Sequence, residues 1–149
     1  TKASASDATR PTTNNTSYGA NLVLDNRPET AWNVPGGQGE WIMLSADTPQ
    51  QIKGIRVLNG YTKFSPVYNM WIYYANSRPK DITLTFSDGS TLVHTLSDTF
   101  DNDNYIYQEI DFGVSKPPPG SRSPSTAYIL EANGTTPAFR NCSPINQRR

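Results

Sequence analysis

Hydrophobic and polar residues alternate along several short stretches of this chain. In Asp81–Phe86 the apolar side chains of Ile82, Leu84 and Phe86 are separated by single threonines. This period of two is typical of a β-strand with one buried face. Further apolar runs or alternations predict strands at Glu40–Leu44, Ile52–Val57, Leu92–Leu96 and Ile106–Phe112. The pattern therefore favours a domain built from short strands.

Turn-forming residues separate these strands. Ser87–Ser90 contains Asp-Gly, which adopts positive φ at little cost, and it predicts a β-hairpin between two of the strands. Turns recur about every eight to twelve residues, and no segment shows the apolar period of a helix. With ten glycines, twelve prolines and 11% aromatic residues, these features predict an all-β fold, either a β-sandwich or a jelly roll.

Length and charge narrow the classes of function. A chain of 149 residues is long enough for one domain with its own hydrophobic core. The formal net charge is zero, so electrostatics gives no reason to expect a nucleic-acid partner. The chain has no run of about 18 apolar residues, so no transmembrane segment is predicted. A globular binding module and a globular enzyme remain.

An aromatic stretch from Asn59 to Gly89 is the candidate binding surface. Its rings are interleaved with amides and cations, and the candidate glycan-binding residues are Tyr61, Lys63, Trp71, Asn76 and Arg78. Sugars present hydroxyl rims and apolar C–H faces. A sugar site therefore needs a flat aromatic ring beside planar amide or guanidinium groups. The five residues predict a glycan or polysaccharide ligand.

Two alternatives remain open for this stretch. In the first, Trp71 and Tyr73 pack in the core, and Arg78 pairs with Asp81 or Asp88. In the second, an exposed apolar patch contacts a protein or a lipid surface. That patch would contain Phe64, Tyr68, Met70 and Trp71. The chain would then be a protein-interaction or membrane-adhesion module with no sugar ligand.

Asp25 and Thr30 bracket a turn with the sequence Asp-Asn-Arg-Pro-Glu-Thr. Their side-chain oxygens, together with carbonyl groups of the turn, are ligands of the kind that Ca²⁺ prefers, so both residues are candidate metal ligands. In the alternative, they only stabilise the turn by hydrogen bonds while Trp32 packs in the core. One carboxylate is few for a calcium site, which favours the alternative.

The sequence contains no constellation typical of catalysis. His94 is the only histidine, and it lies in the middle of a predicted strand. The motifs G-x-S-x-G and H-E-x-x-H are both absent. Asp101 and Asp103 lie in a polar loop, whereas acid–base catalysis needs a carboxyl group held in an apolar pocket. We therefore predict that the chain is not an enzyme.

Several pieces of the chain, in order, resemble one superfamily. They are ASAS at 3–6, NLVLDNRPETAW at 21–32, GEWIML at 39–44, NGYTK at 59–63, NSRPKDITLTFSDG at 76–89 and TLSD at 95–98. Together they resemble the galactose-binding-like superfamily of discoidin and coagulation-factor C-type β-sandwiches. Within it, they are most similar to the glycan-binding module of NAD glycohydrolase toxins and bacterial surface proteins. The resemblance covers residues 3–113.

The resemblance implies a non-catalytic module of a larger bacterial protein, located at the cell surface or outside the cell. It implies a galactose-binding-domain-like β-sandwich over residues 1–113 that binds a surface glycan. Because the catalytic domain of those toxins is absent here, the resemblance implies binding and no hydrolysis. In many relatives the loop that matches Asp25–Thr30 holds a structural Ca²⁺, with help from a glutamate near the C-terminus.

The character of the sequence changes at Val114. Half of the twelve prolines lie in residues 114–149, and the family pattern YPG-x-K-x-x-DT-x-ISE is replaced by STAYILEANGTTPAFR at 125–140. Permitted codons for that stretch, read from the third base, encode DSLYPGSKWDDTCISE. We hypothesise that the tail is an out-of-frame product that has lost the calcium-site glutamate. Resequencing that finds an intact frame, and no sister copy reading YPGSKW, would contradict this.

The consequence of this change is an atypical, Pro-rich second segment over residues 114–149. Its composition predicts an irregular and partly disordered tail. Within it, Thr126–Leu130 is β-prone and able to substitute for a missing strand of the sandwich.

Overall fold

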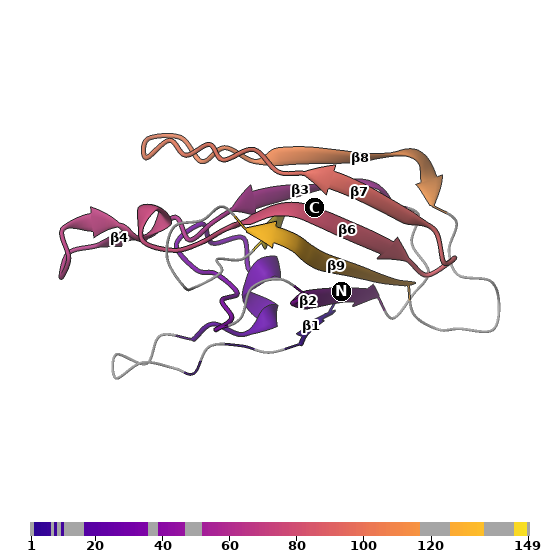
Figure 1. Ribbon diagram of the computed structural model, residues 1–149, viewed down its shortest axis with the longest axis horizontal. Coiled ribbons are helices and arrows are strands. Elements are labelled where there is room, and N and C mark those ends of the chain that lie inside the picture. Colours follow the sequence, from indigo (N-terminus) through magenta and orange to yellow (C-terminus); the bar gives the residue numbers. More distant parts are fainter. Residues whose placement is uncertain are drawn as a thin grey trace.

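A computed structural model describes residues 2–6, 8, 10, 17–35, 39–46, 52–116, 126–135 and 145–148. Nearly all regular structure in this part of the chain is β-strand (Figure 1). The helical segments among these residues are two short 3₁₀ helices, η1 (Ala20–Leu24) and η2 (Ile72–Tyr74). Neither is long and apolar enough to cross a membrane. The predicted all-β fold class is confirmed.

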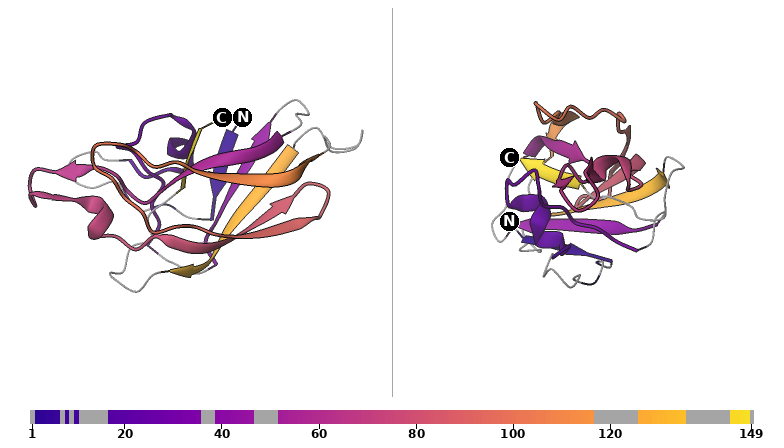
Figure 2. Two further views of the ribbon diagram at one scale, coloured as in Figure 1. Left: turned by 90° about the horizontal axis from the view of Figure 1, so that it is seen from above. Right: turned by 90° about the vertical axis from the view of Figure 1, so that its left-hand side faces the viewer.

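The described strands form two antiparallel sheets and a small ribbon. The larger sheet has the order β1 (Lys2–Ala5), β2 (Trp41–Ala46), β9 (Thr126–Thr135), β6 (Pro79–Phe86) and β7 (Thr91–Thr95). The smaller sheet has the order β10 (Ile145–Arg148), β3 (Ile52–Asn59) and β8 (Gln108–Lys116). The ribbon consists of β4 (Phe64–Ser65) and β5 (Met70–Trp71). The sheets lie in two layers, as Figure 2 shows, which is the predicted β-sandwich.

The core lies between the two layers and takes apolar residues from both sheets. Ile82 and Leu84 of β6 are fully buried, as is Ile42 of β2. Val57 of β3 and Ile110 of β8 belong to the same buried cluster. Removing each such side chain from water contributes about 1.5–3 kcal/mol. The alternation predicted for β6 is therefore confirmed, since its apolar residues are buried and its threonines are only half-buried.

The predicted hairpin turn joins β6 to β7. The backbone N–H of Phe86 donates to the carbonyl oxygen of Ser90 at 2.9 Å, and Gly89 adopts a φ of 84°. The carboxylate of Asp88 accepts a hydrogen bond from the backbone N–H of Ser90 at 2.9 Å. The Asp-Gly pair thus closes the turn by the chemistry expected of it.

The stretch beyond residue 113 contributes strands to both sheets. β9 pairs with β2 on one side and with β6 on the other, and β10 pairs with β3. Thr126–Leu130 lies within β9 and forms the strand that its composition allows. The division of the chain at residue 113 and the out-of-frame origin of the tail stay predictions. Residues 117–125 and 136–144, on which the predicted disorder falls, lie outside the described residues.

The loop that connects β7 to β8 runs beside the end of the sandwich. We call Ser97–Asn104 the acidic loop. Its base is held by Gln108, whose side chain accepts from the Ser97 backbone N–H at 2.6 Å and donates to the Ser97 carbonyl oxygen at 2.9 Å. The strand predicted to start at Ile106 starts at Gln108 instead, because Ile106 is an exposed loop residue.

Candidate functional site

The β4–β5 ribbon projects from one end of the sandwich (Figure 1). An aromatic cluster joins this ribbon to η2 and the acidic loop. The cluster consists of Phe64, Trp71, Tyr73, Tyr74 and Phe100. Phe64 and Trp71 pair across the ribbon, and their rings meet edge to face with centroids 5.5 Å apart. Tyr73 and Tyr74 follow on η2 and also meet edge to face, at 5.6 Å.

Phe100 is the central ring of this aromatic cluster, although it belongs to the acidic loop. It stacks on Tyr73 with centroids 4.6 Å apart and an interplanar angle of 16°. It also contacts Trp71 at 5.3 Å and Tyr74 at 5.6 Å. Such ring pairs contribute about 0.5–1.5 kcal/mol beyond their burial. Nothing in the sequence predicts this contact, because a phenylalanine among aspartates and asparagines carries no signal for a distant partner.

Arg78 ties the acidic loop to η2. Its Nε and Nη2 donate to the two carboxylate oxygens of Asp98 at 2.8 and 3.0 Å. Its Nη1 donates to the carbonyl oxygens of Tyr73 and Asn76 at 2.5 and 2.7 Å. The guanidinium carbon lies 4.1 Å from the centroid of the Tyr73 ring, a cation–π contact. Four of the five N–H donors of Arg78 therefore form hydrogen bonds within the protein.

The protonation states in this network follow from its contacts. The hydrogen bonds from Arg78 are the main cause that lowers the pKa of Asp98. Burial, with the hydrogen bond to Asp98, raises the pKa of Tyr73. At neutral pH, Asp98 is therefore ionised and Tyr73 is neutral. This is the state in which the Tyr73 hydroxyl donates to Asp98, at 2.5 Å.

Gly60 makes room for the network. Its φ is 90°, a left-handed conformation that favours glycine. A Cβ atom at this position would lie 2.6 Å from the Tyr73 ring and 2.8 Å from Cδ of Arg78. The preceding residue, Asn59, donates from its side chain to the Pro79 carbonyl oxygen at 3.0 Å. The Asn-Gly pair thus holds the start of β6 against the end of β3.

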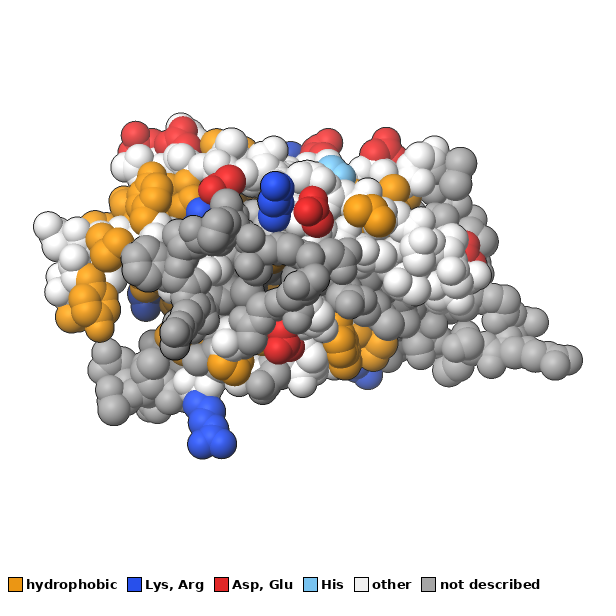
Figure 3. Space-filling model, viewed as in Figure 1, with side chains coloured by type: hydrophobic (Ala, Val, Ile, Leu, Met, Phe, Trp, Pro, Cys, Tyr) orange, Lys and Arg blue, Asp and Glu red, His pale blue; other side chains and the backbone are white. Residues whose placement is uncertain are grey.

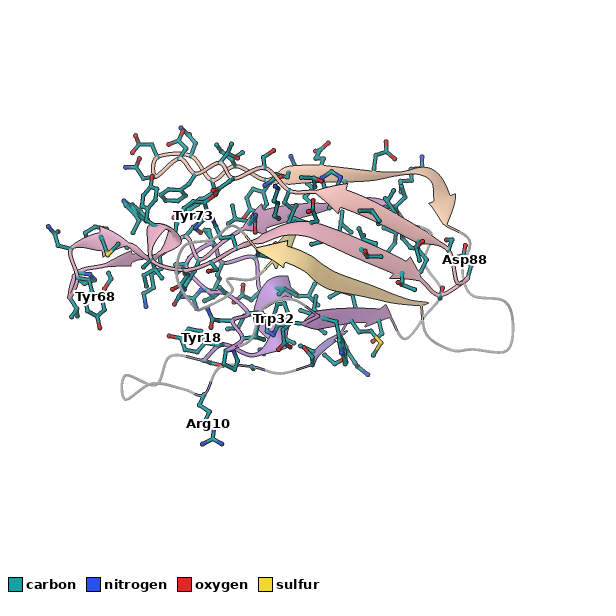
Figure 4. All side chains as sticks on the ribbon, viewed as in Figure 1. Arg10, Tyr18, Trp32, Tyr68, Tyr73 and Asp88 are labelled. Carbon is teal, nitrogen blue, oxygen red and sulfur yellow. The ribbon has the colours of Figure 1, made fainter. Side chains whose placement is uncertain are left out.

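One face of the aromatic cluster is open to solvent. Tyr74 is 59% exposed and Phe64 is 40% exposed. Figure 3 shows hydrophobic side chains gathered at this end of the molecule, and Figure 4 shows Tyr73 beside the acidic loop. In that loop, Asp101 accepts hydrogen bonds from the backbone N–H groups of Asp103 and Asn104, and these bonds lower the pKa of Asp101. The loop that contributes Phe100 to the cluster therefore also carries an ionised carboxylate.

Two of the predicted glycan-binding residues do not belong to the aromatic cluster. Tyr61 is only 4% exposed and packs edge-on against Tyr18, with ring centroids 6.1 Å apart. Burial raises the pKa of Tyr61 to about 12. Lys63 is half-buried. A backbone hydrogen bond and a hydrogen bond from Arg27 lower the pKa of Glu29, and the positive charge of Lys63 lowers it further. A ring so deeply buried offers no face to a sugar, so Tyr61 has a packing role in place of the predicted stacking role.

Trp71, Asn76 and Arg78 are brought together by η2 and the segment that follows it. Trp71 and Asn76 are half-buried. Arg78 donates a hydrogen bond to the backbone carbonyl oxygen of Asn76. The ion-pair partner of Arg78 is Asp98 rather than Asp81 or Asp88. The contact of these three residues with a glycan stays a prediction. The structure supports a direct role more readily for Trp71 and Asn76 than for Arg78, whose side chain is only 12% exposed.

The ribbon ends in an exposed apolar tip. We call Pro66–Asn69 the hairpin tip. Val67 is 77% exposed and Tyr68 is 75% exposed, and Figure 4 shows Tyr68 at the far end of the ribbon. No charged residue occurs between Lys63 and Arg78. Exposed apolar side chains gathered in this way are typical of a contact surface.

The two candidate calcium ligands are engaged with each other. The carboxylate of Asp25 accepts from the backbone N–H of Arg27 at 2.9 Å and from the hydroxyl of Thr30 at 2.7 Å. Trp32 is buried in the core, as the turn-stabilising alternative expects. No group of three His, Cys, Asp or Glu side chains in the described part of the chain is placed to hold a metal ion. These residues alone do not fit a calcium shell, and calcium binding stays a prediction.

These observations define the class of the protein, a discoidin-type β-sandwich with an aromatic surface at one end. The family model of the NAD glycohydrolase translocation F5/8 type C domain matches residues 1–118. The chain therefore belongs to this family, and the resemblance inferred from its motifs is confirmed. A domain of this type is non-catalytic and compatible with a binding module.

No curated protein matches the chain. Four chains among the solved structures match it. One is a cryo-EM structure of a mutant of the arabinofuranosyltransferase AftD from Mycobacteria, with 15% sequence identity and a TM-score of 0.58. The match covers 95% of this chain and 10% of that chain, so this chain spans about a tenth of that protein's length. A likeness at this identity shows the fold alone.

Proposed function

We propose that the chain is a non-catalytic module that binds a glycan on the exposed face of the aromatic cluster. The observation that carries the proposal is the state of Tyr74, which is 59% exposed while its ring is held edge-on by Tyr73 and Phe100. A ring fixed in this way presents a surface to a ligand without further loss of side-chain freedom. This is the property that stacking on a sugar requires.

The groups around Tyr74 support a sugar better than other small ligands. The C–H face of a pyranose packs on an aromatic ring, and its hydroxyls need donors and acceptors at the rim. Asn76 supplies an amide two residues further on, and the acidic loop supplies the carboxylate of Asp101. The aromatic cluster and its rim thus contain both kinds of group.

The family supports the setting of this binding. Its description names NAD glycohydrolase translocation, which agrees with a module that belongs to a larger protein. The attachment of that protein to surface glycans is our proposal. We place that protein at the bacterial cell surface or outside the cell. A non-catalytic role for this chain agrees with the single histidine, His94, which lies half-buried on β7 as the sequence predicts.

A glycan array tests the proposal with two exposed tyrosines as a matched pair. Tyr74→Ala removes a ring of the aromatic cluster, whereas Tyr68→Ala removes a ring of the hairpin tip. We expect the unmodified chain to bind one class of glycan, Tyr74→Ala to lose at least tenfold in affinity, and Tyr68→Ala to bind normally. Circular dichroism confirms the fold of each variant. A folded chain that binds no glycan, or binding that survives Tyr74→Ala, contradicts the proposal.

The hairpin tip favours a second candidate function, adhesion to a membrane or a protein. Val67 and Tyr68 are the most exposed large hydrophobic residues of the described chain, and the stretch between Lys63 and Arg78 that contains them has no charged residue. Aromatic and aliphatic side chains of this kind partition into a lipid interface. Cosedimentation with zwitterionic lipid vesicles that is abolished by Val67→Asp, with no glycan bound, would favour this function over the first.

A further inference from the structure

β7 is an edge strand of the larger sheet. Among the described strands it pairs with β6 alone, and β6 lies between β7 and β9 (Figure 1). A strand in this position has one row of backbone N–H and C=O groups without a ladder partner.

Two hydrogen bonds fix which residues of β7 point their backbone groups outward. At the start of β7, the backbone N–H of Phe86 donates to the carbonyl oxygen of Ser90. At the end of β7, the backbone N–H of Leu96 donates to the carbonyl oxygen of Lys80 at 2.7 Å. In an antiparallel ladder, hydrogen-bonded and non-hydrogen-bonded pairs alternate. Leu92 and His94 therefore bond to β6 as well. The outward row belongs to Thr91, Val93 and Thr95.

This outward row lacks the usual protection of a sheet edge. Thr91, Val93 and Thr95 are all exposed, and Val93 is 66% exposed. Proteins commonly guard edge strands with charged residues or proline. The sequence of β7, TLVHT, contains no Lys, Arg, Asp, Glu or Pro. By contrast, the edge strand β8 of the other sheet carries exposed Glu109 and Asp111.

We propose that β7 pairs antiparallel with β7 of a second copy of this chain, about a two-fold axis at Val93. The outward groups lie at Val93 and two residues to either side, so a two-fold axis at Val93 places each donor opposite an acceptor. Val93 then pairs with Val93 of the second copy, and Thr91 pairs with Thr95. These are β-branched pairs with no like charges opposed, which stabilise sheets. The interface is isologous.

The pairing goes beyond the proposed function because it fixes how two modules are arranged. The larger sheets of both copies would form one continuous sheet. The aromatic cluster lies near Arg78 and Asp98, at the start of β6 and just beyond the end of β7. In an antiparallel dimer these ends lie at opposite sides, so the two exposed tyrosines at position 74 face apart. Sites that face apart cannot both engage one flat surface, so the dimer would bridge two separate ligands.

Cysteine crosslinking of the chain, residues 1–149, tests the register. In a Cys142→Ser background, Val93→Cys places two thiols on the axis, where paired Cα atoms lie about 5.5 Å apart, within the range of about 4.4–6.8 Å that a disulfide spans. Thr91→Cys is the matched control. Position 91 lies on the same exposed row, but it faces Thr95 of the second copy. The two cysteines at position 91 would therefore be four residues, or about 14 Å, apart along the strands.

We expect a mild oxidant to convert Val93→Cys into a covalent dimer at least tenfold faster than Thr91→Cys. The Thr91→Cys/Thr95→Cys double variant should crosslink as well.

Sedimentation of the unmodified chain should show twice the mass of 16.5 kDa at high concentration. The Val93→Lys variant should sediment as one chain with an unchanged circular dichroism spectrum. Equal crosslinking of the two single variants, or a folded chain that stays monomeric at millimolar concentration, would overturn the proposal.

Discussion

At Gly60 the backbone adopts a left-handed conformation and passes directly against the ring of Tyr73 and the stem of Arg78. The sequence predicts a turn here from Asn59-Gly60, and it places Arg78 and Tyr73 in one loop system. It does not predict that Asp98 is the partner of Arg78. The reason is physical: several aspartates lie within reach along the chain, and only the tertiary fold decides between them.

Gly60→Ala is expected to destabilise the protein by about 2–4 kcal/mol, from strain at positive φ together with overpacking against Tyr73 and Arg78. Gly89→Ala is the matched control, because Gly89 has a φ of 84° but nothing within 4 Å of an added Cβ atom. The control should lose only about 1–2 kcal/mol. Chemical denaturation measures both. Equal losses in the two variants would mean that close packing at Gly60 is unimportant.

The Arg78–Asp98 ion pair predicts a pH dependence of stability. Arg78 lowers the pKa of Asp98 in the folded state, so the unfolded chain binds the proton more tightly. The stabilisation is therefore complete above the unfolded pKa of about 3.9 and is lost as the pH falls through the lower folded pKa. Asp98→Asn should remove this dependence. Urea unfolding at neutral and acid pH compares the two proteins, and their difference in stability should shrink in acid. A constant difference would contradict the assignment.

Elements of the chain differ in how far the sequence predicts them. β6 follows directly from its alternation, since every second residue must be apolar to face a core. The β4–β5 ribbon does not follow, because the stretch from Phe64 to Trp71 has aromatic residues but no strand-length alternation. Nor does the contact of the acidic loop with η2 through Phe100, since loops carry no periodic signal.

The hairpin tip is expected to be separable from the fold. The ribbon that carries it is joined by only the pairs Phe64↔Trp71 and Ser65↔Met70, and the hairpin tip is exposed. Replacing the four residues of the hairpin tip, Pro66–Asn69, by Asn-Gly introduces a two-residue turn that suits antiparallel strands. The melting temperature should change by about 3 °C or less, because little buried surface is lost. Thermal denaturation checks this.

The same tip replacement separates the two candidate functions. Glycan binding through the aromatic cluster should persist in this variant, whereas any binding to lipid vesicles should disappear. Loss of glycan binding, with the fold intact, would move the site from Tyr74 to the hairpin tip and would count against the proposed function.

For the whole molecule, the fold class follows from composition and alternation, but the position of the last strands does not. The division predicted at residue 113 stays a prediction, and the sequence offers Thr126–Leu130 only as a strand able to substitute for a missing one. In the structure, β9 instead lies between β2 and β6. Strand order depends on long-range pairing, to which the local sequence of β9 contributes only a β propensity.

Truncation after Lys116 tests which description holds. Removing β9 would leave the backbone groups of both β2 and β6 unpaired along the middle of the sheet, so the shortened chain should lose its cooperative thermal transition and aggregate. Circular dichroism melting and light scattering measure this. A shortened chain that melts as the full chain does would instead support a domain that ends near residue 113.

The central claim is that the exposed face of the aromatic cluster binds glycans. Two-dimensional NMR of the isotopically labelled chain, titrated with a panel of soluble oligosaccharides, tests it most directly. We predict saturable shifts at Tyr74, Asn76 and the acidic loop, with the signals of Val67 and Tyr68 unmoved. A well-dispersed spectrum that no oligosaccharide changes, or shifts confined to the hairpin tip, would contradict the claim.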